Sequence, residues 1–581
     1  MYTVPQIQKV IVKEGLLNAK DYAKYVEEAE AKGEQIIDYL VSKEVVGEEA
    51  IYQLMAQSIG RPFINLKDRN IRQDILFLIP EPIAKTHDIL AYEKTTDGIL
   101  KVAAVDPDDI QTFEFIEKKT GCPLEINLTS PASISQALRL YHQSLEIEFK
   151  NLSKSTWQVE SVDGEDGDKQ LQKLATDLPV VRLVNSLLEY AIFEGASDIH
   201  IEPQEKEVIV RYRIDGILRP VMTLPKTVLS GIIARIKILA NLKLDEHRLP
   251  QDGRFKIEDE NYKISFRVST IPVFDGEKIV MRLLDEGNKL LKLEDLGFRD
   301  KDFKKILVGI DKPYGMILVT GPTGSGKTTT LYAILSRLNT SEVNIATVED
   351  PIEYRMEHVN QSQVNPKIKF TFAIGLRALL RQDPDIIMVG EIRDQETAEI
   401  AIHSAMTGHK VLSTLHTNDA PGTLPRLLDM GVVSFLIAST VNVVVGQRLV
   451  RKICQHCIMS YKLDKKAIES LSDQVDVNFF LKVLQQEGVI ESGQKSLGTL
   501  LFFKGKGCKK CNNTGYKGRL GIYEVLEVTP EIQTLIMNKA TAAELRLAAR
   551  KQGMSVMLED GLIKAKNGIT TIEEVLRVTK E

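Results

Sequence analysis

Short apolar runs, each followed by glycine or by acidic residues, recur in the second half of the chain. The clearest are Met316-Ile317-Leu318-Val319, Asn344 to Val348, Ile386 to Val389 and Val411 to Leu415. Apolar runs of this length, bounded by turn signals, are typical of strands buried inside a parallel sheet. The pattern therefore predicts an α/β domain in this half, with polar side chains gathered where the strands end.

The first part of the chain carries two other patterns. Residues Val10 to Glu30 and Tyr39 to Gly60 place apolar side chains at helical spacing and form an imperfect repeat, which predicts a small helical bundle. Beyond Pro62 short strands and helices alternate, and Ile99 to Val105 is the clearest strand. Residues 1–145 are therefore expected to form a helical repeat followed by a small α/β subdomain.

A polar stretch separates this part from the next one. Glu160 to Asp168 is rich in acid and glycine and has little to bury, so residues 146–175 are predicted to be a flexible linker. An apolar-periodic helix then begins near Pro179, and strand-like segments with hairpin turns follow. We expect a compact α/β domain at 176–290 and the larger α/β domain, ending in helices, at 291–581.

Length and composition fit this multidomain α/β architecture and narrow the function. A chain of 581 residues has room for about three or four domains, and 43% hydrophobic residues is a globular composition. The net charge of -5 and the pI of about 6.1 lack the strongly basic signature of a dedicated nucleic-acid binder. This disfavours a helicase.

The N-terminus and the hydropathy of the chain indicate where the protein works. Met1 to Gly15 has no basic region followed by an apolar core. No window of about 18 uninterrupted apolar residues occurs anywhere in the sequence. We therefore expect a cytoplasmic protein whose association with a membrane comes through partners.

The strongest chemical signal follows the strand that ends near Val319. The segment fits G-x-x-x-x-G-K-[ST] and lies between a strand and a helix, the context that a phosphate loop requires. Backbone N–H groups of such a loop surround phosphate oxygens, Lys327 supplies a positive charge to the β- and γ-phosphates, and Thr328 offers a hydroxyl to Mg²⁺. The predicted ATP-binding residues are Gly321, Pro322, Thr323, Gly324, Ser325, Gly326, Lys327, Thr328 and Thr329.

Carboxylates follow the predicted strand that ends at Val348. Glu349, Asp350 and Glu353 come directly after it, at the edge of a parallel sheet where ligands bind. Acids so close to a phosphate loop can activate water or bind Mg²⁺. A solvated acidic turn is the plain alternative.

Glu391 follows the next predicted strand. Gly390 stands before it, where most phosphate-loop enzymes have a Mg²⁺-binding aspartate. Glu391 is therefore expected to carry the acidic chemistry of this strand. Mg²⁺ would then rest on Thr328, the phosphates and water, with carboxylates further out.

Two more pairs of polar residues lie in this domain. His409 and His416 flank the predicted strand Val411 to Leu415. Arg377 and Arg381 are four positions apart, which on a helix is one face. Spacing alone leaves structural histidines and a solvated basic stripe as the plain alternatives.

Four of the five cysteines form two C-x-x-C pairs. Four thiolates without histidine or an open position indicate a structural, tetrahedral Zn²⁺ site, and redox-active dithiols are the alternative. The gap between the pairs is wider than in a compact zinc ribbon and contains helical sequence near Asn478 to Glu487, so the metal would close a subdomain at 452–515. The predicted zinc ligands are Cys454, Cys457, Cys508 and Cys511.

Four motifs together mark a resemblance to a known family. They are GASDIHIEP at 195–203, RYRIDG at 211–216, LPQDGR at 249–254 and GPTGSGKTTTLYA at 321–333. They resemble the secretion ATPases of type IV pilus assembly and type II secretion, over nearly the whole chain. The resemblance implies a RecA-like phosphate-loop core, a preceding PAS-like α/β domain, a zinc-knuckle insertion and a helical and α/β N-terminal domain.

The resemblance also implies roles for individual residues. Glu353 would be the catalytic base of the family's aspartate box, and Glu391 the acid of its Walker B strand. His416 would sense the γ-phosphate, with His409 in the same histidine box. The arginines near the nucleotide would be Arg211 and Arg213 of the preceding domain and Arg377, Arg381 and Arg519 of the motor.

On this resemblance the chain is expected to be a hexameric motor ATPase that works with an inner-membrane platform protein to add pilin to a type IV pilus. A type II secretion ATPase that drives a pseudopilus is the nearest alternative, and a nucleic-acid translocase or an inactive nucleotide sensor are others. The N-terminal domain would dock on a membrane-anchored adaptor. Cyclic di-GMP is not expected there, because Val4-Pro5-Gln6 and Gly33-Glu34-Gln35 stand where relatives that bind it carry arginine-leucine-glycine.

Overall fold

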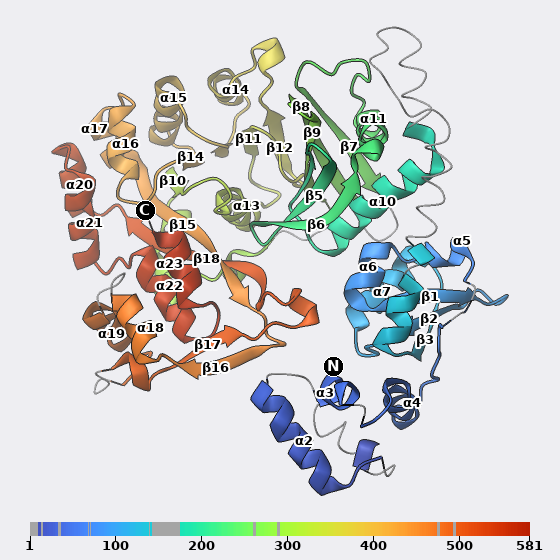
Figure 1. Cartoon of the computed structure of the whole chain (residues 1–581). Coiled ribbons are helices and arrows are strands. Elements are labelled where there is room, and N and C mark those ends of the chain that lie inside the picture. Colours follow the sequence, from blue (N-terminus) through green and yellow to red (C-terminus); the bar gives the residue numbers. More distant parts are fainter. Residues whose placement is uncertain are drawn as a thin grey trace. The chain divides into compact units, whose positions relative to one another are not determined.

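The computed structural model describes residues 10–12, 16–32, 36–43, 45–67, 69, 71–138, 140–141, 175–258, 263–286, 291–472, 477–491 and 496–580. The chain separates into two compact units, Met1–Asp285 and Glu286–Glu581 (Figure 1). Apart from its last residue, the linker predicted at 146–175 lies outside the described residues.

Unit 1 begins with the helices α2 (Ala19–Lys32), α3 (Ile36–Ser42) and α4 (Glu48–Ser58). Tyr22 and Leu40 are buried in a small apolar cluster that α2 and α3 share. The described parts of the predicted repeat are therefore helices joined by short turns. The two segments compared with the arginine-leucine-glycine signature, 4–6 and 33–35, lie outside the described residues.

A small sheet follows, as expected beyond Pro62. Strands β1 (Ile89–Lys94) and β2 (Leu100–Ala104) form an antiparallel hairpin, and β3 (Leu124–Leu128) lies parallel to β2. Helix α7 (Ile110–Thr120) makes the connection between the parallel strands, which a hairpin turn cannot make. Helices α5 (Gln73–Leu76) and α6 (Glu81–His87) precede the sheet.

The rest of unit 1 is a six-stranded antiparallel sheet with the strand order β6-β5-β4-β9-β8-β7. Successive residues of a strand face opposite sides of a sheet. In β5, Val208, Val210 and Tyr212 are buried, whereas Arg211 and Arg213 lie on the other face. The elements of this domain are α10 (Leu178–Phe193), β4 (Asp198–Pro203), β5 (Glu207–Ile214), β6 (Ile217–Pro225), η1 (Lys226–Val228), α11 (Leu229–Leu239), β7 (Gln251–Glu258), β8 (Lys263–Val273) and β9 (Gly276–Asp285).

Unit 2 is built on a seven-stranded sheet with the strand order β12-β11-β13-β14-β10-β15-β18. The pairs from β12 to β15 are all parallel, and β18 adds an antiparallel edge. The four strands predicted from apolar runs are confirmed as β10, β11, β13 and β14. The strand bounds are β10 (Gly315–Thr320), β11 (Ile345–Glu349), β12 (Val359–Gln363), β13 (Ile386–Val389), β14 (Lys410–Leu415), β15 (Val441–Ile453) and β18 (Tyr516–Glu527).

Helices cover both faces of this sheet. Met316 and Leu318 of β10 join one apolar cluster, whereas Ile317 and Val319 join another. Burial on both faces explains the uninterrupted apolar runs. Among the described residues, no helix has the length and hydropathy of a membrane span. The covering elements are η2 (Leu293–Leu296), α12 (Asp300–Asp311), α13 (Lys327–Leu338), η3 (Pro366–Ile368), α14 (Phe372–Leu379), α15 (Gln395–Met406), α16 (Thr423–Asp429) and α17 (Ser434–Thr440).

An insertion between β15 and β18 forms a small subdomain. Its strands β16 (Ile458–Lys462) and β17 (Leu501–Gly505) pair antiparallel. Helix α19 (Val477–Gln486) agrees with the helical sequence noted at 478–487, and α18 (Lys465–Ser472), η4 (Leu497–Thr499) and η5 (Lys509–Cys511) complete the insertion. After β18 the chain ends in the helices α20 (Pro530–Met537), α21 (Ala542–Lys551), α22 (Met557–Lys566) and α23 (Ile572–Thr579).

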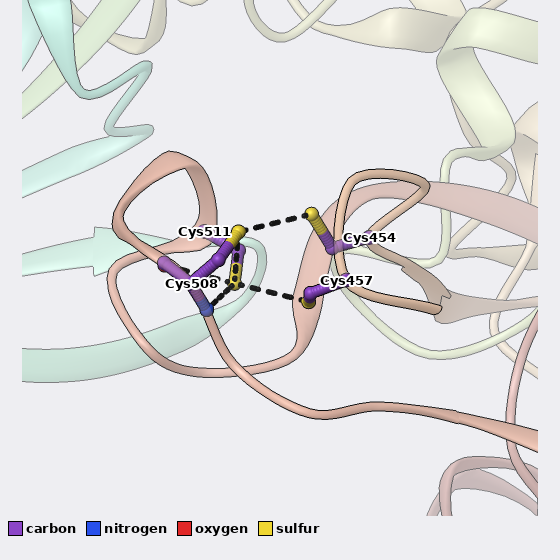
Figure 2. A group of neighbouring side chains, drawn as sticks. All are labelled: Cys454, Cys457, Cys508 and Cys511. Atoms are coloured by element: carbon purple, nitrogen blue, oxygen red, sulfur yellow. Dashed lines mark hydrogen bonds between the residues drawn. The ribbon is translucent and has the colours of Figure 1, made fainter. Parts of the chain in front are cut away.

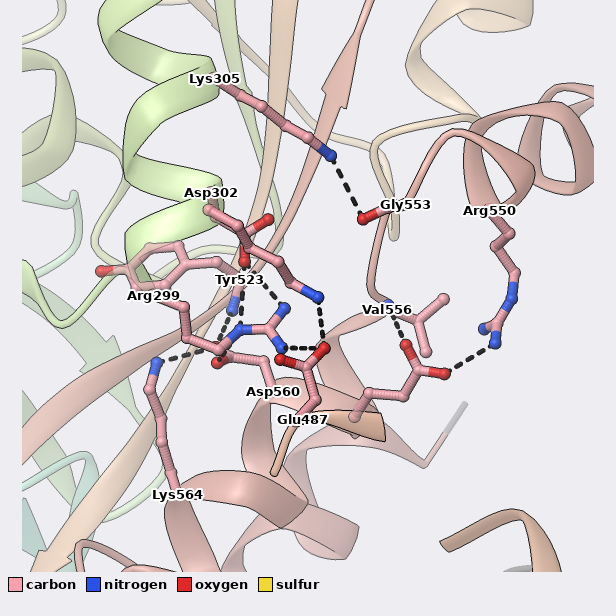
Figure 3. A network of polar contacts seen from close by, with 12 residues as sticks. Arg299, Asp302, Lys305, Glu487, Tyr523, Arg550, Gly553, Val556, Asp560 and Lys564 are labelled. Atoms are coloured by element: carbon pink, nitrogen blue, oxygen red, sulfur yellow. Dashed lines mark hydrogen bonds and ion pairs between the residues drawn. The ribbon is translucent and has the colours of Figure 1, made fainter. Parts of the chain in front are cut away.

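A buried ionic network ties the first long helix of unit 2 to its C-terminal helices (Figure 3). Arg299, which precedes α12, lies 2.8 Å from Asp302 and 3.1 Å from Asp560 of α22. Asp560 also lies 2.7 Å from Lys564 and accepts the backbone N–H of Tyr523 at 2.8 Å. Asp302 and Asp560 are each 1% exposed. Loss of either cation would therefore leave a buried carboxylate uncompensated, which is strongly destabilising.

Candidate nucleotide site and metal centre

The predicted phosphate loop connects the end of β10 to the start of α13. Its glycines Gly321, Gly324 and Gly326 have φ angles of 147°, 77° and 87°, which L side chains rarely adopt. A Cβ on Gly321 would lie 2.4 Å from the carbonyl oxygen of Gln447, and one on Gly326 would lie 2.8 Å from its Nε2. The backbone conformation therefore favours glycine at all three positions, and the close approach of β15 excludes a side chain at Gly321 and Gly326.

Lys327 is the first residue of α13 and points back into the loop. Its Nζ donates to the carbonyl oxygens of Gly321 at 2.8 Å and Pro322 at 3.1 Å. Burial lowers the pKa of Lys327, and the nearby Glu391 carboxylate opposes this shift. The loop thus holds a cation close to the position where a helix N-terminus favours phosphate.

Gln447 of β15 is a site residue that the sequence patterns did not indicate. Thr330 of α13 donates to its Oε1 at 2.7 Å. The strand register brings it there, because β15 runs parallel to β10 and Gly446 pairs with Thr320. Gln447 therefore fixes the phosphate-loop helix to the neighbouring strand.

Glu349, the last residue of β11, is held in a buried set of hydrogen bonds. Its carboxylate accepts from Tyr332 at 2.5 Å, from Thr347 at 2.6 Å and from Gln361 at 3.1 Å. Burial raises the pKa of Glu349, and these donors oppose the shift. The Tyr332 hydroxyl also accepts the backbone N–H of Glu353 at 3.3 Å. The phosphate-loop helix thus positions the acidic segment that contains the predicted base.

Glu391 lies beyond the end of β13, level with the end of β10. Val389 pairs with Ser413, and Ser413 pairs with Leu318 on its other side. The carboxylate of Glu391 forms an ion pair with Arg393 and lies 3.1 Å from Nε2 of His416. The structure thus brings Glu391 and His416 together beside the phosphate loop.

Gly390 explains why the usual aspartate is missing. A Cβ at this position would lie 3.3 Å from both Cα of Glu349 and the carbonyl oxygen of Val348, backbone atoms of the paired strand. We expect Gly390→Asp to lower the free energy of unfolding by about 1–3 kcal/mol, because overpacking forces the strands apart. Urea unfolding measures this effect.

The matched control for that substitution is Gly47→Ala. A Cβ added at Gly47 would meet nothing within 4 Å, and the residue has an ordinary φ of -67°. Its replacement should change stability by less than about 0.5 kcal/mol. A Gly390→Asp chain as stable as the parent would show that β11 and β13 can separate without loss.

The two predicted histidines lie at opposite edges of the sheet. Strand β14 is parallel to β10, and its last residue pairs with Thr320, the last residue of β10. His416 follows β14 at this edge, close to Glu391. His409 precedes β14 at the far edge, where its Nδ1 lies 3.0 Å from the carbonyl oxygen of Ser404. Within this chain His409 does not join the phosphate-loop site, because the whole length of β14 separates the two histidines.

The predicted arginines of the motor have other partners in this chain. Helix α14 ends before Arg381, so the expected shared helix face does not form. Arg381 donates to the carbonyl oxygen of Arg377 at 2.9 Å, and Arg377 lies 2.5 Å from Glu396 of α15. Arg519 is exposed on β18, and the strand register places it opposite Arg451 of β15.

Arg211 and Arg213 lie on the charged face of the six-stranded sheet of unit 1. Arg211 lies 2.8 Å from Glu202, and Arg213 lies 3.3 Å from Asp198. Residues that the strand pairing places side by side form a row across the sheet, from β5 through β4, β9 and β8 to β7. The row that contains Arg213 is completed by Asp198, Arg282, Arg267 and Arg254.

The four cysteines of the two C-x-x-C pairs meet at the base of the insertion (Figure 2). Neighbouring Sγ atoms are 3.6–3.9 Å apart, and all four lie within 4.8 Å of one another. Zn–S bonds of about 2.3 Å in a tetrahedron place sulfurs about 3.8 Å apart. Backbone N–H groups of Cys508 and Gly515 donate to Sγ of Cys511 at 3.2 and 3.3 Å. The cluster therefore has the donor set and dimensions of a structural zinc site.

The sequence of this chain is similar to those of known protein families and proteins. The family model for the type II/IV secretion system protein matches residues 173–577, and that for the MshEN domain matches 59–148. The chain is 41% identical to the type IV pilus assembly ATPase PilB of Myxococcus xanthus, over 98% of each chain. It is 44% identical to the type II secretion system protein E of Xanthomonas campestris, over 84% of this chain and 82% of that protein.

A solved structure supports the fold. The DotB ATPase of Yersinia pseudotuberculosis is similar with a TM-score of 0.50 and 22% identity, over 69% of this chain and 93% of that one. At this identity the similarity concerns the fold alone.

Proposed function

The chain belongs to the type II/IV secretion system protein family, and we propose that it is the motor that polymerises a type IV pilus. As a member of that family it is an ATP-hydrolysing motor enzyme. One observation carries the choice of pilus assembly over secretion. The similarity to a pilus assembly ATPase extends over nearly the full length of both chains, whereas that to the secretion relative covers less of this chain.

The phosphate loop binds ATP in this proposal. Its backbone N–H groups and Lys327 hold the phosphates, and Thr328 would hold Mg²⁺ together with phosphate oxygens and water. Glu353 takes the proton of the attacking water, while Glu391 orients the reacting groups with His416. The support is the common edge of the sheet, where β10, β11, β13 and β14 all end.

Arginines of the preceding, PAS-like domain supply the charge that couples hydrolysis to movement. An arginine that reaches the transferring phosphoryl group stabilises its spread negative charge, and such a contact depends on domain position. The row that contains Arg213 supports this role, because it aligns four arginines with a single carboxylate, that of Asp198. Arg211 lies on the same face of the sheet.

Replacement of Arg211 by alanine is expected to reduce ATP turnover by about 10³-fold or more and to leave ATP binding largely intact. The reason is that the guanidinium acts on the transition state and not on the bound nucleotide. Steady-state phosphate release and binding of a fluorescent nucleotide separate the two effects. Lys206→Ala, which removes an exposed charge from the β4–β5 turn, is the matched control. Turnover near the parent rate in Arg211→Ala would remove Arg211 from the mechanism.

The partners follow from the same proposal. The chain forms a hexamer, works in the cytoplasm against an inner-membrane platform protein, and acts on pilin only indirectly. Zn²⁺ on the tetracysteine cluster closes the insertion, in line with the sulfur geometry. No nucleic acid is involved, and stimulation of the ATPase by DNA would overturn this point.

The N-terminal region, in which residues 59–148 match the MshEN domain model, has a separate role in this proposal. We propose that this region docks on a membrane-anchored adaptor without cyclic di-GMP. Calorimetry of the whole chain with cyclic di-GMP tests this directly. Micromolar binding would make the region a nucleotide sensor instead.

Electron microscopy of the native host tests the proposed function as a whole. The parent chain is replaced by Glu391→Gln, surface pili are counted, and exported proteins are measured in the medium. Loss of pili with normal export supports the extension motor. Normal pili with failed export would identify a type II secretion ATPase.

A further inference from the structure

A buried carboxyl group lies in the C-terminal half of β18, on a sheet face that is otherwise apolar. Glu524 is only 3% exposed, and its neighbours on the same face, Ile522 and Leu526, are both 0% exposed. Burial raises the pKa of Glu524 to about 7, although the backbone N–H of Ala420 opposes the shift. Burying such a group is unfavourable unless it is hydrogen-bonded. The contacts that Glu524 makes therefore have to account for its position.

The strand register brings Glu524 to the edge of the sheet where the phosphate loop begins. Pairing across four strands places Leu415, Thr320, Gly446 and Glu524 in one row. Thr320 is the last residue before the phosphate loop, and Leu415 is the last residue before His416. Glu524 is thus level with both ends of the candidate site, although it belongs to the last strand of the sheet.

The segment that follows His416, residues 417–422, fills the space that Gly446 leaves; we call it the histidine turn. A Cβ on Gly446 would lie 3.1 Å from the backbone nitrogen of Ala420 and 2.8 Å from Cγ of Glu524. The N–H of Ala420 donates to Oε1 of Glu524 at 2.5 Å. Ala420 is 0% exposed, so without Glu524 this N–H would be a buried donor that lacks its acceptor.

Two further contacts hold the histidine turn. The N–H of Thr417 donates to Oγ1 of Thr320 at 3.0 Å. One carboxylate oxygen of Asp419 accepts the N–H of Gly422 at 2.7 Å, and the other forms an ion pair with Arg546 of α21. The turn is therefore a connected unit that is held by the end of β10, by β18 and by α21.

The position of His416 depends on this turn. His416 is the single residue between the end of β14 and Thr417. Its side chain is half exposed, and its Nε2 lies 3.1 Å from Oε2 of Glu391. A shift of the turn would therefore move the imidazole relative to Glu391. A displacement of about 1 Å at a reacting group can lower a rate by about 10²-fold.

We propose that Glu524 is a positioning residue for ATP hydrolysis, which holds the histidine turn so that His416 faces Glu391 beside the phosphate loop. Arg546 supports the same turn from α21. The proposal rests on the role that the proposed function gives to His416. Glu524 acts through the turn, because its Oε1 binds the backbone of Ala420.

A double-mutant cycle on the full chain tests this link. We expect Glu524→Ala to lower kcat by about 10- to 100-fold and to change ATP affinity by less than about twofold, since the phosphate loop is intact. His416→Ala should lower kcat by about 10²-fold. In the His416→Ala background, Glu524→Ala should lower kcat by less than about twofold further, because its effect passes through the imidazole. Phosphate release measures kcat, and a fluorescent nucleotide measures binding.

Arg546→Ala tests the same turn without a change in the core, since the Arg546 side chain is 41% exposed. It should lower kcat by about three- to tenfold in the parent chain and by less than about twofold in His416→Ala. The matched control is Arg550→Ala. Arg550 lies on the same helix and pairs with Glu559 at 2.7 Å, and its loss should leave kcat at the parent value. If Glu524→Ala does not fold, the cycle with Arg546→Ala decides.

Three results would overturn the proposal. Equal losses of kcat in the parent and His416→Ala backgrounds would show that Glu524 supports the fold and not the position of His416. Weaker ATP affinity at unchanged kcat would assign Glu524 to nucleotide binding. Turnover of His416→Ala at the parent rate would remove His416 from the proposed mechanism itself, whereas an impaired His416→Ala with parent-like Glu524→Ala and Arg546→Ala would refute the positioning role alone.

Discussion

Replacement of Glu391 by glutamine is expected to lower kcat for ATP by about 10²–10⁴-fold while ATP binding is retained. The Glu391 side chain is only 12% exposed, and its carboxylate is paired with Arg393 and lies 3.1 Å from Nε2 of His416. Glutamine keeps the size of the side chain but removes the negative charge that, in the proposed mechanism, orients the reacting groups. Phosphate release measures kcat, and a fluorescent nucleotide measures binding on the same sample.

Two companion variants sharpen this experiment. Glu342→Gln changes an exposed carboxylate in the connection before β11 and should leave kcat at the parent value. Glu353→Gln compares the two predicted acids directly, and the larger loss identifies the residue that contacts the reacting water. Turnover of Glu391→Gln at the parent rate would exclude Glu391 from the chemistry.

Replacement of Cys511 by serine is expected to abolish stoichiometric zinc and to destabilise the strands β16 and β17 of the insertion. Structural zinc binding contributes about 10–16 kcal/mol in small zinc domains, more than most domains have in total stability. The apolar core around Phe480 and Phe502 is shared with β15, β18 and the helices α22 and α23, so the loss of the metal should be felt mainly at the cysteine knuckles and at the two strands next to them. Elemental analysis gives the zinc content, and hydrogen exchange of β16 and β17 gives the local stability.

The control for this prediction is Cys122→Ser. Cys122 is also buried, but it lies in unit 1 and outside the four-cysteine cluster. It should leave the zinc content and the exchange of β16 and β17 unchanged. If Cys511→Ser keeps one zinc per chain, the cluster does not hold the metal through all four thiolates.

The motor sheet could be predicted because its strands are buried on both faces. That burial gives continuous apolar runs such as Met316 to Val319, which stand out in the sequence. The phosphate loop could also be predicted from the sequence, since the positive φ angles of Gly321, Gly324 and Gly326 favour glycine at fixed spacing. The two C-x-x-C pairs converge as predicted, in the arrangement that tetrahedral ligation by four thiolates would need.

The features that could not be predicted depend on the register and the direction of the strands. His409 and His416 look alike beside an apolar run, and only the parallel pairing of β14 with β10 shows that they lie at opposite edges. The row from Arg213 to Arg254 combines residues of five strands, and no sequence spacing reveals which of them align. The role of Gln447 could not be predicted for the same reason, since Thr330, which donates a hydrogen bond to it, lies far away along the chain.

Strand β15 joins the two sites of the motor in a way that limits how the chain can vary in length. Gln447 contacts the phosphate-loop helix. Cys454 is the first residue after the same strand and lies roughly 20 Å from Gln447 along it. Because side chains alternate, one inserted or deleted residue between them would turn the later side chains to the opposite face, unless a register irregularity such as the one between Arg451 and Ile453 takes it up. Chains that keep both sites should therefore change length more readily between the two C-x-x-C pairs than between Gln447 and Cys454.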